Sequence, residues 1–401
     1  MNFVSIKDKK VGNFKNKNVL VRVDFNVPIK NGKILSDFKL KQSLPTIEYL
    51  LKQQAGRLII VSHLGRPQGY DSSLSLKPVV KFLEKALHQK ILFIDFKKTD
   101  QNLSGIAKII REQNAPKLIL LDNIRFFEGE ENDSKAFAKN LANLADVFVF
   151  DGFAVSHRKA ASVSGVTKFL PSFAGLLVER EVSGLSKLTQ SPKHPLVVAL
   201  GGIKLETKIP VIKKFLPIAD YIILGGGLAN TYWHSLEKKV GMSVVDEAYK
   251  NYFKTIRKNA KIIIPIDLVV GKKNGKESHV VGVEGKVLAG PEEAIYDVGP
   301  KTIKLFEKYV KRAKTIVWNG AFGFFEQTPY QKGTYAIARS IAKQSKGRNF
   351  AVCGGGETEE ILHKLHIFDD IDLVSTGGGA MLEFLGGKKM PGLVNLKQKN
   401  N

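Results

Sequence analysis

The sequence predicts an α/β protein with two lobes, each a mostly parallel sheet with helices on both faces. Short apolar runs alternate with segments of helical period throughout the chain, at intervals that suit βαβ units. The apolar runs are almost uninterrupted, as expected for parallel strands buried on both faces. The residues that follow these runs are polar and cationic in the first half but glycine-rich in the second. This difference indicates two lobes with different ligands.

Composition limits the classes of protein to which the chain can belong. Its 401 residues favour more than one domain, and 43% hydrophobic residues are enough for two cores. The N-terminal residues lack the apolar stretch of a secretory signal, and no apolar run approaches the roughly 20 residues that span a bilayer. The single cysteine, Cys353, excludes an internal disulfide and suits a reducing compartment. We therefore expect a cytoplasmic protein without membrane contact.

The chain is strongly basic, with a net charge of +24 and a sequence pI near 9.8. Such a balance suits a partner that is a nucleic acid or an acidic small molecule. The lysines are scattered, however, without a long basic run, zinc-finger spacing or an RNA-recognition signature. We expect a generally basic surface and no nucleic-acid partner.

The first half contains strands predicted at Val19–Asp24, Arg57–Ser62, Ile91–Asp95, Lys117–Leu121 and Val147–Asp151, with helices at Leu44–Gln53, Pro78–Leu87 and Ala136–Leu144. Along the first strand and its extension, Arg22, Asp24 and Asn26 alternate, so their side chains lie on one face. A buried charged pair costs free energy unless its groups pair or bind a ligand. Taken alone, a structural ion pair between Arg22 and Asp24 explains this strand end equally well.

Polar and cationic side chains also follow the other strands of the first half. In a parallel sheet the carboxyl ends of the strands lie along one edge, where ligands bind. Guanidinium groups match phosphate and carboxylate oxygens in pairs, whereas any one arginine is explained as well by a surface ion pair. Their recurrence at four strand ends predicts a site for a small polyanion, formed by Arg22, Asp24, Asn26, Lys39, His63, Arg66, Arg125, His157 and Arg158.

A domain boundary is predicted near the middle of the chain. Gly175–Leu188 has an amphipathic helical pattern, and Pro192 and Pro195 then interrupt the chain before a new strand. We expect a first lobe at residues 1–174, a connecting hinge helix at 175–190, a second lobe at 191–384 and a tail at 385–401.

The second half repeats the alternation of strands and helices, but glycines follow its strands. These strands are predicted at Leu196–Leu200, Tyr221–Leu224, Thr315–Trp318, Phe350–Cys353 and Leu373–Thr376, and residues 262–281 are predicted to form a short hairpin. Glycine lets backbone N–H groups approach a ligand, and the following helix N-terminus attracts anions. One such turn is weak support, but several at one sheet edge predict a nucleotide phosphate site. No P-loop motif occurs, and GGGLAN at Gly225–Asn230 fails the dinucleotide motif at its last position.

A lobe with arginines for a small anion and a lobe with glycine loops for a nucleotide indicate phosphoryl transfer in a cleft that closes to exclude water. From about residue 14 to 396 the chain resembles the phosphoglycerate kinase family. The motifs that carry the resemblance are RVDFNVP at Arg22–Pro28, SHLGRP at Ser62–Pro67, DNIRF at Asp122–Phe126, HR at His157–Arg158, WNGAFGFFE at Trp318–Glu326, GGGET at Gly354–Thr358 and STGGGAMLEFL at Ser375–Leu385.

The resemblance implies two Rossmann-like lobes joined by a hinge, and a tail that returns to the first lobe. It implies reversible phosphoryl transfer between 1,3-bisphosphoglycerate and ADP, giving 3-phosphoglycerate and ATP, in glycolysis. Magnesium bound with the nucleotide is the implied cofactor, and a monomer is the implied assembly.

The resemblance also assigns roles to individual residues. At the substrate site it places Asp24, Asn26, His63, Leu64, Gly65, Arg66, Arg125 and Arg158. At the nucleotide site it places Lys204, Lys208, Gly226, Gly227, Asn319, Glu326, Gly354, Gly355, Gly356, Glu357 and Thr358, with Glu326 at the ribose. In catalysis it places Lys39, Lys208, Gly378 and Gly379, and it makes Glu357 the magnesium ligand.

Several positions depart from the family pattern. The family's catalytic arginine falls on Lys39, which keeps the charge but lacks the planar fork, so we expect a rate about 10- to 100-fold lower. Glu357 and Glu206 stand where the family has aspartates, which lengthens each carboxylate by one methylene. Other departures are Phe150 for an asparagine, Ala154 for a glycine and Ala160 for a histidine.

Three functions are compatible with this pattern. A working but slower phosphoglycerate kinase explains why His63 and the three arginines of the substrate motifs are retained. A non-catalytic nucleotide- or nucleic-acid-binding protein on the same fold would explain Lys39 and the high net charge. A kinase for a related small carboxylate would use the same groups. Nucleoside preference is not readable, because base pockets are mostly apolar and selected by shape.

Overall fold

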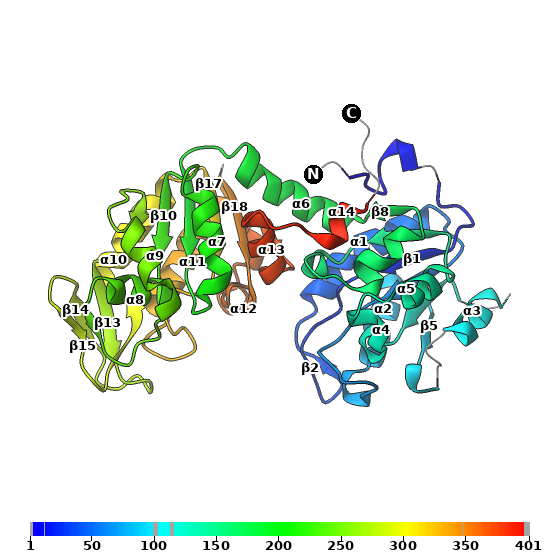
Figure 1. Ribbon diagram of the computed structural model, residues 1–401, viewed down its shortest axis with the longest axis horizontal. Coiled ribbons are helices and arrows are strands. Elements are labelled where there is room, and N and C mark those ends of the chain that lie inside the picture. Colours follow the sequence, from blue (N-terminus) through cyan, green and yellow to red (C-terminus); the bar gives the residue numbers. More distant parts are fainter. Residues whose placement is uncertain (1–2, 12, 99–102, 113–115, 348, 397–401) are drawn as a thin grey trace. The chain divides into compact units, whose positions relative to one another are not determined.

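The computed structural model describes residues 3–11, 13–98, 103–112, 116–347 and 349–396, and it consists of two compact units (Figure 1). The first unit comprises Met1–Ser183 and Lys389–Asn401, and the second comprises Gly184–Lys388. The division falls within helix α6 (Leu176–Gln190). No helix in these ranges is long and apolar enough to cross a membrane.

A six-stranded sheet with only parallel pairings forms the centre of the first unit, in the order β5-β6-β4-β1-β7-β8. Its strands are β1 (Val19–Arg22), β4 (Leu58–Val61), β5 (Ile91–Ile94), β6 (Leu118–Leu121), β7 (Val147–Phe150) and β8 (Ser172–Ala174). The helices of this unit are α1 (Phe38–Lys52), α2 (Lys77–Leu87), α3 (Ser104–Arg111), α4 (Glu128–Glu131), α5 (Lys135–Ala142) and α14 (Pro391–Val394). The short strands β2 (Ile29–Lys30) and β3 (Lys33–Ile34) form a separate hairpin.

Strand β1 is completely buried between β4 and β7, which explains its unbroken β-branched and apolar sequence. Arg22, its last residue, pairs in register with Val61 on one side and Phe150 on the other. The chain leaves β1 toward β4 and returns on the opposite side at β7, so the sheet changes direction beside the end of β1. Ligands bind in the crevice at such a switch point.

Helix α1 begins earlier than the sequence pattern predicted. We expected a helix at Leu44–Gln53, but α1 begins at Phe38 and contains Pro45 in its interior. This earlier start places Lys39 and Lys41 in the first helical turn rather than in a loop. The prediction was wrong because proline is most common in the first turn, whereas packing here extends the helix toward its N-terminus.

The second unit has its own six-stranded parallel sheet, in the order β12-β10-β9-β17-β18-β19. Numbered along the chain, this is the order 3-2-1-4-5-6 of the Rossmann fold. The strands are β9 (Leu196–Leu200), β10 (Tyr221–Leu224), β12 (Ile262–Ile263), β17 (Thr315–Asn319), β18 (Phe350–Gly354) and β19 (Leu373–Ser375). The helices are α7 (Leu205–Phe215), α8 (Gly226–Ser235), α9 (Lys250–Ile256), α10 (Pro300–Arg312), α11 (Lys332–Ser345), α12 (Gly356–Lys364) and α13 (Gly378–Leu385).

Smaller strand pairs complete the second unit. Strand β13 (Asp267–Gly271) pairs antiparallel with β14 (His279–Gly282) and with β16 (Ala294–Val298), and β11 (Lys239–Val240) pairs parallel with β15 (Val287–Ala289). The hairpin predicted within residues 262–281 is confirmed by the β13–β14 pair.

The described part of the C-terminal tail packs on the first unit. The Gly392 N–H donates to the Ser156 carbonyl at 2.9 Å. A Cβ atom at Gly392 would lie 2.9 Å from ring and methyl carbons of Phe150 and Val163, so glycine allows this close approach. Residues 397–401 of the predicted tail lie outside the described residues.

Candidate active site

The end of β1 carries a buried carboxylate that is paired with a cation. Asp24 is 3% exposed, and its Oδ2 atom accepts a 2.8 Å hydrogen bond from Nζ of Lys39. Its Oδ1 atom lies 3.7 Å from Nδ1 of His63 and accepts from the Asn26 N–H. Burial alone would raise the pKa of Asp24, but Lys39, His63 and these hydrogen bonds outweigh it and lower the pKa to about 2. Asp24 is therefore ionised at neutral pH.

Lys39 reaches Asp24 because it lies in the first turn of α1, and about a fifth of its side chain (21%) stays exposed. Lys41, the other lysine of this turn, is paired instead with Asp37 at 2.9 Å, and both side chains are exposed. Lys39 thus contacts Oδ2 of Asp24 as a compact point charge, whereas a guanidinium would present a planar fork of donors.

Arg22 connects this carboxylate to the interior of the unit. It is completely buried and donates to Oγ of Ser162 at 2.8 Å and to the Val23 carbonyl. Its Nη2 atom lies 3.3 Å from Nδ1 of His63. Burial lowers the pKa of His63 well below its usual value, so the imidazole is neutral. Since the guanidinium can only donate, Nδ1 accepts and the imidazole proton is on Nε2.

A buried carboxylate behind Arg22 was missed by the sequence reasoning. Glu130, at the third position of α4, is 1% exposed, and its two oxygens accept from the backbone N–H and Oγ of Ser162. Ser162 in turn accepts from Arg22, so Glu130 supports the guanidinium through one hydroxyl. Burial raises the pKa of Glu130 and lowers that of Arg22. The acidic run around Glu130 looks like a solvated helix end in the sequence, which hid this role.

Arg22, Arg125 and Arg158 line one cavity of about 220 Å³. Burial lowers the pKa of Arg125 to about 10, and the neighbouring charge of Arg158 acts in the same direction. Glu131 partly offsets this repulsion, with Oε1 3.0 Å from Nε of Arg125. Three guanidinium groups that repel one another around a cavity form a site for a multiply charged anion.

Backbone and amide hydrogen bonds shape the loop after β4. The Gly65 N–H donates to Oδ1 of Asn26 at 3.0 Å, and the Gly65 carbonyl accepts from Arg125 at 2.6 Å. The Leu64 carbonyl accepts a 2.6 Å bond from the side-chain amide of Asn123, which also holds the Leu74 carbonyl. The structure therefore brings together the predicted residues Asn26, Leu64, Gly65 and Arg125. Arg66 is exposed and makes no hydrogen bond or ion pair with the described residues.

In the second unit, backbone contacts join the glycine loops that follow the parallel strands. The Gly227 N–H donates to the Gly202 carbonyl at 3.0 Å, and the Gly202 N–H donates to the Ala321 carbonyl at 2.6 Å. A Cβ atom at Gly378 would lie 2.6 Å from Cα of Gly355. The loops after β9, β10 and β17 are thus in direct contact, as are those after β18 and β19. Side chains larger than hydrogen would separate them.

A buried lysine faces this edge of the second sheet. Lys208 of α7 is 6% exposed, and burial lowers its pKa while Glu357 acts in the opposite direction. A Cβ atom at Gly202 would lie 3.0 Å from Oε2 of Glu357 and 3.5 Å from Nζ of Lys208, so these three residues are neighbours. Glu357 is exposed, accepts a 3.3 Å bond from the Ala321 N–H, and begins the first turn of α12. Lys204 is exposed, and its charge also lowers the pKa of Lys208.

Asn319 and Thr358, two residues predicted at the nucleotide site, are buried and hydrogen-bond the loops to one another. The side-chain amide of buried Asn319 donates to the Gly354 carbonyl, and Oγ1 of buried Thr358 accepts from the Gly320 N–H at 2.9 Å. Both bonds connect the ends of β17 and β18. These side chains set the positions of the neighbouring backbone N–H groups.

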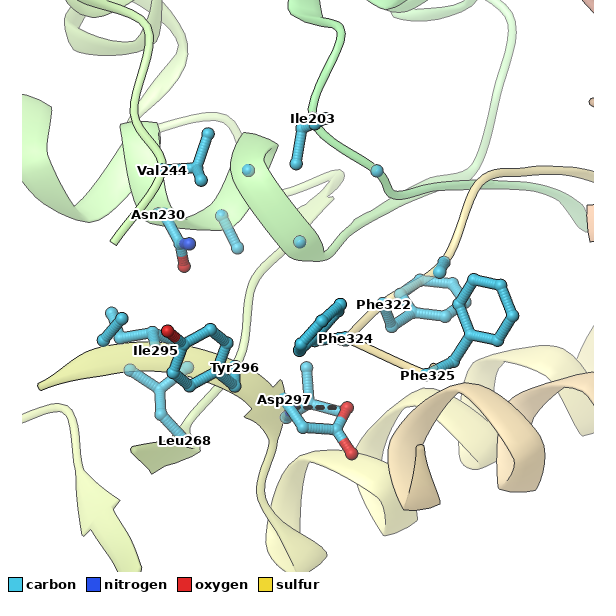
Figure 2. A pocket seen from close by; sticks show the side chains of 18 of the residues that line it. Ile203, Asn230, Val244, Leu268, Ile295, Tyr296, Asp297, Phe322, Phe324 and Phe325 are labelled. Carbon is cyan, nitrogen blue, oxygen red and sulfur yellow. Dashed lines mark hydrogen bonds between the residues drawn. The ribbon is translucent and has the colours of Figure 1, made fainter. Parts of the chain in front are cut away.

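A pocket of about 520 Å³ opens beside the glycine loops (Figure 2). Gly202, Gly226, Gly227 and Glu357 line it together with Glu326. Its remaining lining is mostly apolar and aromatic, with Val244, Leu268, Ile295, Tyr296, Phe322, Phe324 and Phe325. An apolar cleft next to glycine loops has the composition of a nucleotide site, with phosphates at the loops and a base in the apolar part. The contribution of Tyr296 was not foreseen, because Tyr296 belongs to no motif, whereas Phe322, Phe324 and Phe325 lie within the WNGAFGFFE motif.

Comparisons with known proteins agree with this geometry. A family model described as phosphoglycerate kinase matches residues 7–388. The chain is similar to phosphoglycerate kinases of Coprothermobacter proteolyticus (38% identity, 99% of each chain) and Finegoldia magna (40% identity, 98% of each chain). It also resembles the solved phosphoglycerate kinase structures from Coxiella burnetii (TM-score 0.84, 35% identity) and Pyrococcus horikoshii (TM-score 0.83, 29% identity), with 98% of each chain covered. These structures confirm the predicted fold class of two α/β lobes.

Proposed function

This chain belongs to the phosphoglycerate kinase family and is a phosphotransferase of glycolysis with a carboxyl acceptor, and we propose the roles that its residues have in that reaction. In the direction that forms ATP, the bond between phosphorus and the carboxyl oxygen of 1,3-bisphosphoglycerate breaks. A bond to a terminal phosphate oxygen of ADP forms. The transition state is stabilised mainly by positioned charges and N–H donors.

The first unit binds the glycerate. Arg125 and Arg158 bind the phosphate that is not transferred. Arg66 is exposed and is therefore available as a third donor to this phosphate. His63 donates from Nε2 to a substrate oxygen, since its Nδ1 faces Arg22. Ionised Asp24 accepts from the substrate hydroxyl. The observation that carries this assignment is the cavity lined by Arg22, Arg125 and Arg158, whose mutual repulsion a bound anion relieves.

Two lysines balance the negative charge on the phosphoryl group during its transfer. Lys39 supplies the positive charge that the family resemblance assigns to an arginine, and its bond to Asp24 fixes its position. Lys208 stabilises the phosphoryl group from the second unit, where burial strengthens its electrostatic effect. The N–H groups of Gly378 and Gly379, at the start of α13, donate to the same group.

The remaining nucleotide contacts come from the second unit. Lys204 and the backbone N–H groups of the glycine loops bind the phosphates, and Asn319 and Thr358 orient those loops. Glu326, exposed at the pocket, binds the ribose hydroxyls.

Magnesium fits the nucleotide end of this pocket. The described residues contain no cluster of three or more acidic, His or Cys side chains that would hold a metal without substrate. Mg²⁺ is usually bound by one or two carboxylates together with substrate phosphates, and exposed Glu357 supplies such a carboxylate. When bound with the nucleotide, the ion neutralises phosphate charge. Oε2 of Glu357 and Nζ of Lys208 both lie close to Gly202, so this carboxylate is at the same end of the pocket as the buried lysine.

A monomer in the cytoplasm is the simplest setting for this reaction. Each described site is built from one unit of one chain, so no second copy is required. The single cysteine, Cys353, is completely buried, which is compatible with a reducing compartment.

The test is a coupled assay of the purified chain with 3-phosphoglycerate and MgATP. We expect turnover about 10- to 100-fold below the 1–100 s⁻¹ range of kinases, because of Lys39. A folded chain without turnover above background would overturn the catalytic assignment. DNA binding that persists at physiological salt would then favour the non-catalytic alternative. Turnover with another small carboxylate but not with 3-phosphoglycerate would change the substrate and keep the mechanism.

A further inference from the structure

One polar side chain lies in the apolar part of the pocket without a partner. Asn230, in the second turn of α8, is only 5% exposed and lines the pocket. Its side-chain amide makes no hydrogen bond with any residue that the structure describes. Figure 2 shows its amide directed into the pocket, between Val244 above and Ile295 and Tyr296 below. The GGGLAN motif departs from the dinucleotide motif at this same residue.

The polar atoms of the Asn230 amide are open to the pocket rather than sealed in the interior. A side-chain amide has two N–H donors and one carbonyl acceptor, and covering these groups with an apolar ligand that offers no partner costs free energy. Leucine or phenylalanine would fill this apolar position without that cost. The arrangement is explained if a ligand in the pocket supplies the missing hydrogen bonds.

The neighbouring surface shows where a flat ligand binds. Ile203, Met242 and Val244 line the pocket and are 56%, 71% and 53% exposed, among the largest exposures of apolar side chains in the described chain. On the opposite side, the Tyr296 ring is 5.8 Å from Phe324, and it stacks on Tyr330 at 4.7 Å. A ring bound between these walls covers the exposed side chains and presents its edge to Asn230. The glycine loops then receive the phosphates.

We propose that Asn230 hydrogen-bonds the edge of the nucleobase and makes this chain selective for purines with a hydrogen-bonding group at C6. This inference rests on the nucleotide site proposed above. An amide is complementary both to the amino group and ring nitrogen of adenine and to the oxygen and ring N–H of guanine. The selectivity arises because a purine without the C6 group leaves the amide unpaired.

The proposal is tested by equilibrium binding of ADP, GDP and purine riboside 5′-diphosphate, which lacks the C6 group. Binding does not require turnover, so the result is independent of whether the chain is catalytically active. We expect the wild-type chain to bind ADP or GDP at least tenfold more tightly than purine riboside diphosphate. In Asn230→Leu this ratio falls to about one, with tighter binding of the purine riboside compound than in wild type.

Asn251→Leu, at an exposed position on α9, is the matched control and keeps the wild-type ratio. Thermal unfolding identifies any variant that fails to fold. Equal binding of all three nucleotides by the wild-type chain would overturn the proposal even if Asn230→Leu does not fold. So would an unchanged ratio in folded Asn230→Leu.

Discussion

The two units form their sites by opposite means. In the first unit, charged side chains carry the site: Asp24, Lys39, His63 and Arg22 form one connected cluster, and Arg125 extends it into a cavity. In the second unit, the loops that line the site meet through backbone atoms, and among the residues described there Lys208 is the one buried cation. A small anion needs many directed charges, whereas a nucleotide has a large surface that shape and backbone N–H groups can recognise.

This difference predicts which substitutions each site tolerates. A Cβ atom at Gly201 would lie 2.1 Å from the Ala321 carbonyl oxygen, so even alanine displaces the backbone of the nucleotide loops. In the first unit a change such as arginine to lysine keeps the fold and alters only charge geometry, as Lys39 illustrates. The largest functional effects should therefore follow removal of charge in either unit.

The largest effect is expected at Lys208, the buried lysine of α7 that faces the nucleotide loops. Lys208→Met keeps the apolar stem but removes the charge that faces the phosphoryl group, so kcat should fall about 1,000-fold. Steady-state kinetics with both substrates measures this loss, and the KM for 3-phosphoglycerate should stay nearly constant. Lys214→Met, at an exposed position on α7, is the control. Loss of only a few-fold in Lys208→Met would mean that backbone N–H groups alone stabilise the transition state.

In the first unit several cationic side chains surround the anion site, so removing one of them should lower activity less than Lys208→Met does. Arg158→Ala should lower kcat/KM for 3-phosphoglycerate about 100-fold, because a charged hydrogen bond to the phosphate is lost. The KM for ATP should not change. Arg312→Ala, at an exposed position on α10, is the control. An equal rise in both KM values would show that Arg158 acts on the fold of the chain rather than on one substrate.

Lys39→Arg should increase kcat by about tenfold, since the planar guanidinium presents two parallel N–H donors in a fixed geometry, which the freely rotating ammonium does not. Lys41→Arg makes the same chemical change on the same helical turn, where the side chain pairs with Asp37, and should leave kcat unchanged. A lower rate in Lys39→Arg would mean that the site has been rebuilt around lysine, with the 2.8 Å bond to Asp24 as its fixed point.

Sequence patterns predicted the strands well and the connections between site residues less well. The buried runs Leu196–Leu200 and Tyr221–Leu224 match β9 and β10 residue for residue, since parallel strands show their burial directly in their composition. Motifs marked the three arginines of the first cavity and the glycines and Glu357 of the second pocket. They did not reveal Glu130, which supports Arg22 through Ser162, because that contact joins segments 32 residues apart. They also did not reveal Tyr296, whose place in the pocket depends on the small β13–β16 sheet.

Although their sites differ, the two units share one feature. Each has a buried carboxyl group near the end of a strand that accepts hydrogen bonds from backbone N–H groups. Burial raises the pKa of Asp151, which accepts from the Leu177 and Val178 N–H groups, to about 7. Burial likewise raises the pKa of Asp297, which accepts from Gly333 and Val298, to about 8. A carboxyl with a raised folded pKa stabilises the fold below its unfolded pKa, and this stabilisation is lost as the pH rises through the folded value.

For Asp151 the expected loss is on the order of 1 kcal/mol in the free energy of unfolding between pH 6 and pH 8. Asp151→Asn keeps an acceptor for the Leu177 N–H but does not titrate, so its stability should decline less over this range than that of the wild-type chain. Chemical unfolding at the two pH values measures the difference, and Asp297→Asn serves as the parallel variant in the second unit. If Asp151→Asn retains the full decline, this carboxyl is already ionised at pH 6, and its N–H donors outweigh its burial.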